Sequence, residues 1–169
     1  PGTEATPAMA YAPVGPRAGE EFDAAAAIGK SPGALLFIHE LTRNGLPVIR
    51  GLDQIGAEFD LLGFQSFTFM LSADRTKAET KLKAVNGSLK LRSPIVLSLD
   101  GADGPGNYAL NRKAVLSLIL LKDGKVHQSL AFTDVNAEDS KLVRDLIAAV
   151  SGALPTDPAA LRELAKARV

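Results

Sequence analysis

An uninterrupted apolar run at residues 34–38 constrains the fold of this chain more than any other feature. Such a short run between polar residues is typical of a strand that is buried on both faces of a sheet. A polar passage, residues 39–45, follows the run, and a helix-period pattern begins near Leu46. Since sites in α/β folds usually lie beyond the carboxyl ends of strands, residues 39–45 are where function is expected.

The composition fits one globular domain. The chain has 169 residues, enough for one well-formed core, and 46% of them are hydrophobic. Its 19 basic and 19 acidic side chains give a formal net charge of zero, so there is no excess of positive charge to attract nucleic acid or an anionic membrane. No apolar run is long enough to span a bilayer. We therefore expect no nucleic-acid partner and no membrane span, and the oligomeric state stays open.

The two ends of the chain differ in composition from its middle. Residues 1–30 are expected to form a Pro/Ala-rich arm with a short helix at 24–27, residues 31–152 the folded domain, and residues 153–169 a C-terminal helical extension. The chain opens Pro1-Gly2-Thr3 without an initiator methionine. Removal of an export signal is the commonest reason for a trimmed start, so we expect an exported, extracytoplasmic protein. A trimmed disordered lead is the alternative.

Helices and strands alternate after the polar passage. A helix with one apolar face, ended by Gly63, precedes an alternating strand at 66–71, and the intervening helix makes this strand parallel to the first. A second helix, capped by Asp74 or Thr76, leads to a third strand at 95–99. The apolar face of the first helix comprises Val48, Leu52, Ile55, Phe59 and Leu62.

Asp123-Gly124 predicts a tight hairpin between two apolar runs, residues 115–121 and 125–132. Both turn residues must adopt positive φ, which Asp-Gly tolerates well. The second run alternates, which indicates an edge strand with one wet face. A helix capped by Asn136 and ended by Gly152 closes the domain. The apolar face of the edge strand comprises Val126, Gln128, Leu130 and Phe132.

This order of elements, β-α-β-α-β-β-α, resembles the thioredoxin fold and its thiol-disulfide reductase and peroxiredoxin branch. The likeness covers roughly residues 31–150 and implies a three-layer α/β/α sandwich with a central mixed sheet. It places Thr42-Arg43-Asn44-Gly45 where the family carries its Cys-x-x-Cys motif. The segments that carry the likeness are Leu35-Leu36-Phe37-Ile38-His39-Glu40-Leu41, Pro94-Ile95-Val96-Leu97-Ser98-Leu99-Asp100-Gly101, Tyr108-Ala109-Leu110 and the turn Lys122-Asp123-Gly124-Lys125.

The chain contains no cysteine, and residues 113–116 lack the cis-proline that the family places opposite its redox pair. Thr42 and Gly45 stand at the two cysteine positions. A threonine hydroxyl cannot cycle through a disulfide, and peroxide reduction needs an oxidisable sulfur. We therefore expect no thiol-disulfide oxidoreductase or peroxidase activity, and we assign no catalytic residue and no cofactor. With two histidines and no cysteine, no metal site is predicted either.

Each candidate residue has a structural and a functional interpretation. Thr42 or Asn44 fits an N-cap, and the alternative is an anion pocket that the helix start forms with Arg43. His39 fits a partly buried histidine bonded to backbone or to Glu40, and the alternative is a general base. His127 is expected to be solvated. The candidate ligand-binding residues are His39, Glu40, Thr42, Arg43, Asn44 and Gly45.

The sequence leaves two functions open. The first is a redox-inactive thioredoxin-like domain that acts as a binding or scaffolding module for a protein or peptide. Its contact surface would comprise residues 39–45, residues 113–116 and the Gly-rich loop after Leu99, which fits turn chemistry better than a phosphate or calcium site. The second is a non-redox enzyme that binds a small anionic substrate near Thr42 to Gly45, with His39 or Glu40 as acid or base. A deep pocket lined by Arg43 and His39 would favour the enzyme.

Overall fold

The computed structural model describes residues 4–43, 45–59, 63–101, 104–105, 108, 110, 113–133 and 139–150. The predicted helix cap at Asn136, the stop at Gly152 and residues 153–169 lie outside this part of the chain. Among the described residues no helix has the length and apolar character to cross a bilayer. The elements in chain order are β1 (Met9–Tyr11), β2 (Glu21–Asp23), α1 (Ala24–Ile28), β3 (Gly33–Ile38), α2 (Leu46–Glu58), β4 (Gln65–Met70), α3 (Arg75–Leu89), β5 (Val96–Ser98), β6 (Leu116–Lys122), β7 (Lys125–Phe132) and α4 (Asp139–Val150).

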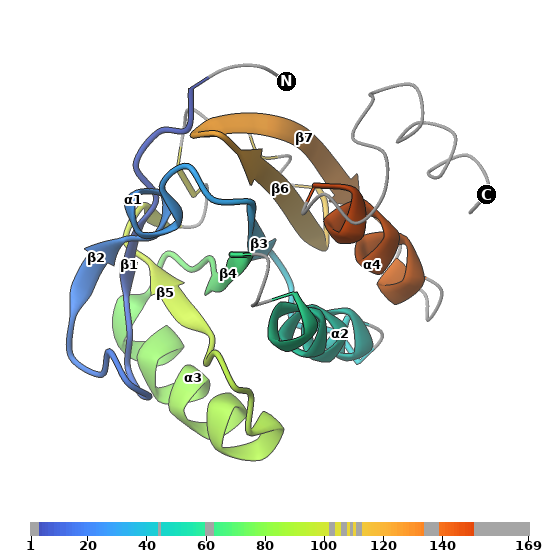
Figure 1. Ribbon diagram of the computed structural model, residues 1–169. Helices are drawn as coiled ribbons and strands as arrows, with labels where there is room; N and C mark the ends of the chain where they lie inside the picture. The colour runs from blue at the N-terminus through green and yellow to red at the C-terminus, as the bar shows by residue number, and fades with distance from the viewer. Residues whose placement is uncertain are drawn as a thin grey trace.

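The strands form one mixed, seven-stranded sheet in the order β2-β1-β5-β4-β3-β6-β7 (Figure 1). β3 lies inside the sheet, parallel to β4 and antiparallel to β6 along its whole length. All of its residues are buried. The interpretation of the apolar run as a doubly covered strand is therefore confirmed, and so is the parallel arrangement of the next strand.

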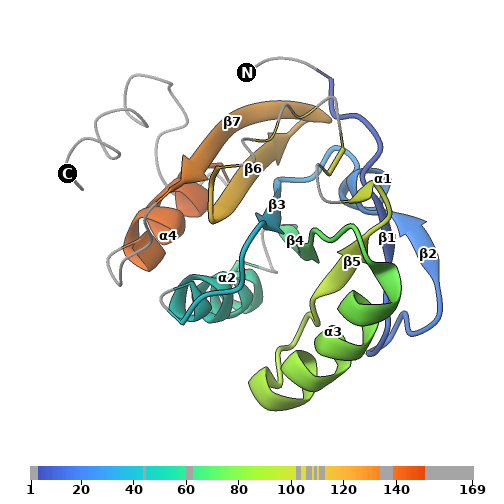
Figure 2. The same ribbon diagram turned by 180° about the vertical axis from the view of Figure 1, so that it is seen from behind.

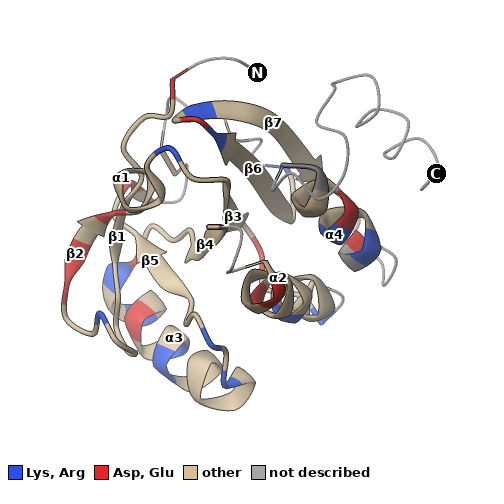
Figure 3. Cartoon of the chain, in the orientation of Figure 1, with Lys and Arg blue, Asp and Glu red and all other residues tan. Residues whose placement is uncertain are grey.

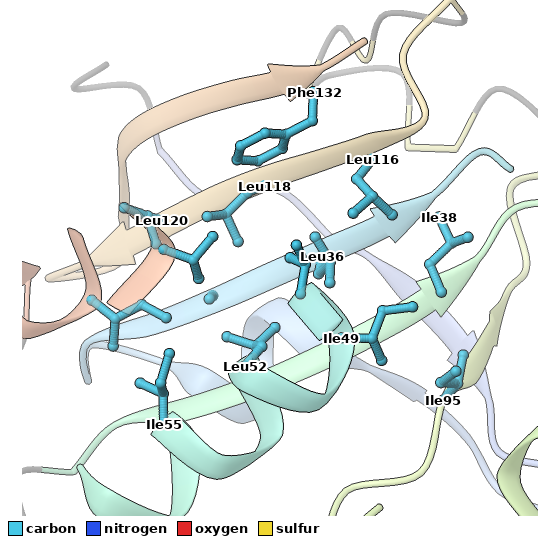
Figure 4. Packing of buried hydrophobic residues seen from close by; sticks show 14 of the residues in the cluster. Leu36, Ile38, Ile49, Leu52, Ile55, Ile95, Leu116, Leu118, Leu120 and Phe132 are labelled. Carbon is cyan, nitrogen blue, oxygen red and sulfur yellow. The ribbon is translucent and has the colours of Figure 1, made fainter. Parts of the chain in front are cut away.

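Side chains of β3 point alternately to the two faces of the sheet, and each face has its own core. Leu36 and Ile38 pack with residues of α2 (Figure 4), and the same core includes residues of α3 and α4. Leu35 and Phe37 pack with α1 and the N-terminal segment on the other face. Helices thus flank the mixed sheet, as the α/β/α sandwich requires, with three of the four described helices on one face (Figures 1 and 2).

The N-terminal segment contributes two strands that the sequence reading missed. β1 pairs with β5 through Ala10 and Ser98, and β2 extends the sheet by one more strand. Ala8, Ala10 and Ala12 are nearly inaccessible because they pack directly on the second core. Small side chains carry little strand signal, which explains the omission. The short helix expected at 24–27 is α1, and Asp23 caps it by accepting hydrogen bonds from two of its backbone amides.

α2 is shorter than predicted. We expected it to run to Gly63, but it ends at Glu58, and the backbone of Phe59 leaves the helical region. The Phe59 carbonyl accepts a hydrogen bond from the Phe64 N–H at 3.3 Å, a wider turn than an α-helix allows. Val48, with Leu52 and Ile55, is buried as expected, whereas Leu62 lies outside the described residues.

The hairpin between β6 and β7 turns at Asp123 and Gly124, whose φ angles of 57° and 76° confirm the predicted turn chemistry. β7 is an edge strand, also as predicted. Its apolar face is nevertheless broken, because an irregularity opposite Leu120 and Leu121 inserts one extra residue. Val126 therefore packs on the core of β3 residues Leu35 and Phe37, while Leu130 and Phe132 pack on the opposite core.

Candidate functional site

The carboxyl end of β3 meets the segment that precedes β6. The backbone N–H groups of His39 and Glu40 donate to the Val115 carbonyl at 2.9 and 3.3 Å. A Cβ atom added to Gly45 would lie 3.8 Å from Cδ1 of Leu116. The two segments that form the redox edge of thioredoxin-like proteins, far apart in sequence, are thus neighbours in this chain. We call this edge, residues 39–45 and 113–116, the β3 edge.

Thr42 holds the turn that leads into α2. Its Oγ1 accepts a hydrogen bond from the Gly45 N–H at 3.1 Å, and its carbonyl accepts from the same N–H at 3.2 Å. Gly45 is the cap of α2 and forms no side-chain cap bond. The prediction that Thr42 is the N-cap of this helix is therefore wrong, because its side chain closes the preceding turn and not the helix itself. Asn44 lies outside the described residues.

The two positions that the resemblance aligns with the family cysteines are close together. A Cβ atom added to Gly45 would lie 3.2 Å from Thr42 Oγ1. Gly45 has φ −78° and ψ −23°, a conformation open to any L-residue. The backbone thus keeps two facing side-chain positions although neither bears a thiol.

His39 bonds to a partner that sequence reasoning missed. Its Nε2 lies 2.8 Å from Ser117 Oγ, where we had expected a bond to backbone or to Glu40. Ser117 pairs with Phe37, two residues before His39, so both side chains lie on the face of the sheet that α1 covers. Burial lowers the pKa of the half-buried His39 imidazole. A lone serine in the apolar run 116–121 was the available signal.

A cleft of about 440 Å³ lies at the same end of the sheet, between β3, β4 and α3. Ile38, Met70 and Ala78 line it with buried apolar side chains of the α2–α3–α4 face. Lys77 and Lys81 project from α3 along its rim. The lining residues are Ile38, His39, Glu40, Leu41, Met70, Leu71, Ser72, Lys77, Ala78 and Lys81.

The structure divides the candidate residues into two groups. His39 and Glu40 border the cleft, whereas Thr42, Arg43 and Gly45 do not. Arg43 is exposed beside the turn before α2. The His39 imidazole is bonded to Ser117, which lies on the face of the sheet that α1 covers. The predicted pocket with both Arg43 and His39 in its lining does not correspond to this cleft.

The other histidine, His127, lies outside this edge. His127 was expected to be solvated, but it is half-buried, and burial together with the Lys122 charge lowers its pKa. Its Nε2 has no hydrogen-bond partner within the described part of the chain. Among those residues no group of three or more acidic or histidine side chains could hold a metal ion.

Comparisons with known proteins agree with this geometry. No family model and no curated protein matches the sequence. Solved structures do match. A protein from Chlorobium tepidum assigned as the thiol:disulfide interchange protein DsbE is 18% identical, with a TM-score of 0.64 over 89% of this chain and 97% of that one. An uncharacterised conserved protein from Geobacillus kaustophilus is 12% identical, with a TM-score of 0.71 over 93% and 85% of the two chains.

A peroxide-reducing protein is also similar. The bacterioferritin comigratory protein of Xanthomonas campestris is 16% identical, with a TM-score of 0.58 over 79% of this chain and 87% of that one. At these identities the likeness establishes the fold alone. The chain therefore has a thioredoxin-like fold without the cysteines on which thiol-disulfide chemistry depends.

Proposed function

We propose that this domain is a redox-inactive binding module that holds a protein or peptide segment at the β3 edge. The observation that carries the proposal is the bond from the Gly45 N–H to Thr42 Oγ1 at 3.1 Å. It stabilises, without sulfur, the turn where thioredoxin-like proteins carry their redox pair. An edge that keeps its shape but lacks its reactive atoms is suited to contact and not to electron transfer.

The side chains around this turn support a contact role. Leu41, Leu46 and Val115 are half-buried apolar residues that pack on the same core, and each keeps part of its surface accessible. Apolar side chains of this kind, with backbone groups nearby, are common in peptide-binding surfaces. Arg43 is exposed beside them and adds a positive charge at the rim.

The geometry gives less support to a non-redox enzyme. An acid or base has to lie within hydrogen-bond reach of the substrate atom it protonates or deprotonates. His39 lines the cleft, but its Nε2 is bonded to Ser117 on the face of the sheet that α1 covers, and Arg43 does not line the same cleft. The binding module is therefore the function that the arrangement supports best.

A peptide library displayed on phage tests the proposal. The domain serves as bait, and the affinity of each enriched peptide is measured for the natural protein and two variants. Val115→Lys places a charge on the β3 edge, and Met9→Lys places one at an exposed apolar residue on β1. We expect Val115→Lys to weaken binding about tenfold or more, as for a central interface residue, and Met9→Lys to leave it unchanged.

Equal affinities for the natural protein and Val115→Lys would contradict the proposal, provided that both proteins have the same melting temperature. Leu46→Lys gives a second test at the same edge, because this half-buried side chain lies at the start of α2. The extracytoplasmic location stays a prediction, which cell fractionation tests.

A further inference from the structure

We propose that the cleft between β3, β4 and α3 binds a small organic anion, and that Lys77 and Lys81 supply its charge contacts. The inference rests on the proposed function in one respect, because it assumes that this end of the sheet binds ligands. It goes further by naming a second subsite and the chemical class of its ligand.

The size and floor of the cleft suit a small molecule with an apolar body. Its volume of about 440 Å³ lies within the range of about 300 to 1,000 Å³ for small-ligand sites. Ile38, Met70 and Ala78 form its floor but are at most 6% exposed, so the half-buried Leu41 supplies more of the accessible apolar surface. An apolar group placed against Leu41 would remove that surface from water, which favours binding.

The rim of the cleft is positively charged. Lys77 and Lys81 lie one turn apart on α3, so their side chains project from the same face of the helix. Both are exposed, and neither forms an ion pair with another described residue, whereas Lys83 pairs with Glu79 at 3.6 Å. Figure 3 shows these alternating charges along α3.

Charge balance decides the sign of the ligand. Glu40 is the one acidic residue among the described residues that line the cleft, so two ammonium groups face one carboxylate. A cation would meet net repulsion there. An anion can contact both lysines, and a partly enclosed cleft strengthens such contacts relative to open surface. Ser72, also in the lining, adds a hydroxyl.

Nuclear magnetic resonance titration of the full chain with four probes tests the inference. Benzoate and phenyl phosphate carry an apolar ring and an anionic group, benzyl alcohol carries the ring alone, and inorganic phosphate carries the charge alone. We expect benzoate or phenyl phosphate to shift the amide signals of residues 38–41, 70–72 and 77–81. Benzyl alcohol and inorganic phosphate should bind at least about tenfold more weakly than the better organic anion.

Two charge-matched variants separate the cleft from general electrostatics. Lys77→Gln/Lys81→Gln removes the proposed contacts, and Lys83→Gln/Lys90→Gln removes the same charge from α3 and the residue that caps its C-terminal end. All four side chains are exposed, so both variants should fold. We expect the first variant to bind the organic anion about tenfold more weakly, which is the loss expected for two exposed charge contacts. The second variant should bind it with the affinity of the natural protein.

Three results would overturn the inference. The first is an equal loss of affinity for the organic anion in both variants, and the second is inorganic phosphate that binds as tightly as phenyl phosphate. The third is a set of amide signal shifts confined to Thr42, Arg43 and Leu46 at the start of α2. The last result would still agree with the proposed function, because the β3 edge would bind a ligand at its other subsite. Equal peptide affinities of the natural protein and Val115→Lys, in turn, would contradict the proposed function without changing the outcome of the titration at the cleft, so the two proposals fail separately.

Discussion

If Thr42 and Gly45 occupy the two redox positions of the fold, a Thr42→Cys/Gly45→Cys variant should form a disulfide. A Cβ atom on Gly45 would lie 3.2 Å from the γ atom of residue 42. In a disulfide the Cβ of one cysteine lies about 3 Å from the sulfur of the other, because an S–S bond of about 2.05 Å joins a C–S bond at a near-tetrahedral angle. Little backbone movement is therefore needed.

The size of the effect follows from the length of the closed loop. Residues 42 and 45 enclose a four-residue loop, and the chain-entropy relation assigns such a loop about 2 kcal/mol of stabilisation at 25 °C. The oxidised and reduced forms of the variant both lack the hydrogen bond from Gly45 N–H to Thr42 Oγ1, so its loss does not enter the comparison between them. We expect the oxidised variant to be more stable than its reduced form by about 2 kcal/mol.

The assay compares urea unfolding with and without reductant, together with mass spectrometry after alkylation to count free thiols. Lys81→Cys/Ala84→Cys is a matched control with the same spacing inside α3. Cβ atoms three residues apart in a helix are about 5 to 6 Å from each other, too far for an unstrained disulfide. A Thr42→Cys/Gly45→Cys protein that stays reduced in a glutathione buffer as fully as this control would refute the reasoning.

Three further changes test the packing. Asn86→Ala should lower the unfolding free energy by about 2 to 4 kcal/mol in urea titrations, because the buried Asn86 side chain bonds both the N–H and the carbonyl of Ile95, at 2.8 and 3.0 Å; a loss below 1 kcal/mol would contradict this. Asp23→Ala should cost about 1 to 2 kcal/mol and loosen α1, which amide exchange measures. Burial lowers the pKa of His39 below the ordinary histidine pKa of 6.5. When the pH falls through 6.5, the unfolded state therefore binds a proton at this histidine that the native state does not yet bind. The unfolding free energy should therefore fall as the pH drops from 7.5 through 6.5, and His39→Gln should reduce that slope; an unchanged slope would count against the buried imidazole.

Much of the fold could be predicted because several local signals agree. The apolar run at 34–38, the alternation at 66–71 and the Asp123-Gly124 turn each depend on side chains adjacent in sequence, and all three elements are present. The N-terminal strands could not be predicted in this way. Their alanines are buried by contacts with β5 and α1, which are non-local. The break in the apolar face of β7 likewise depends on pairing with β6.

The candidate site was predictable in position but not in orientation. The order of strands predicts that the residues after β3 lie next to the segment before β6. The Val115 carbonyl, which accepts hydrogen bonds from the N–H groups of His39 and Glu40, confirms this neighbourhood. The face to which each side chain turns depends on the register between β3 and β6. That register brings His39 to Ser117 and separates it from the start of α2. Lys77 and Lys81 line the same cleft as Glu40 because of the way α3 packs on the sheet, and no local sequence pattern predicts that packing.

The most direct test of the binding role is a map of where a display-selected peptide contacts the domain. In two-dimensional ¹⁵N–¹H spectra, the account predicts the largest peptide-induced shifts at Leu41, Thr42, Leu46 and Val115, on the β3 edge. Shifts centred on the outer strands β2 or β7, with those four signals unmoved, would contradict it.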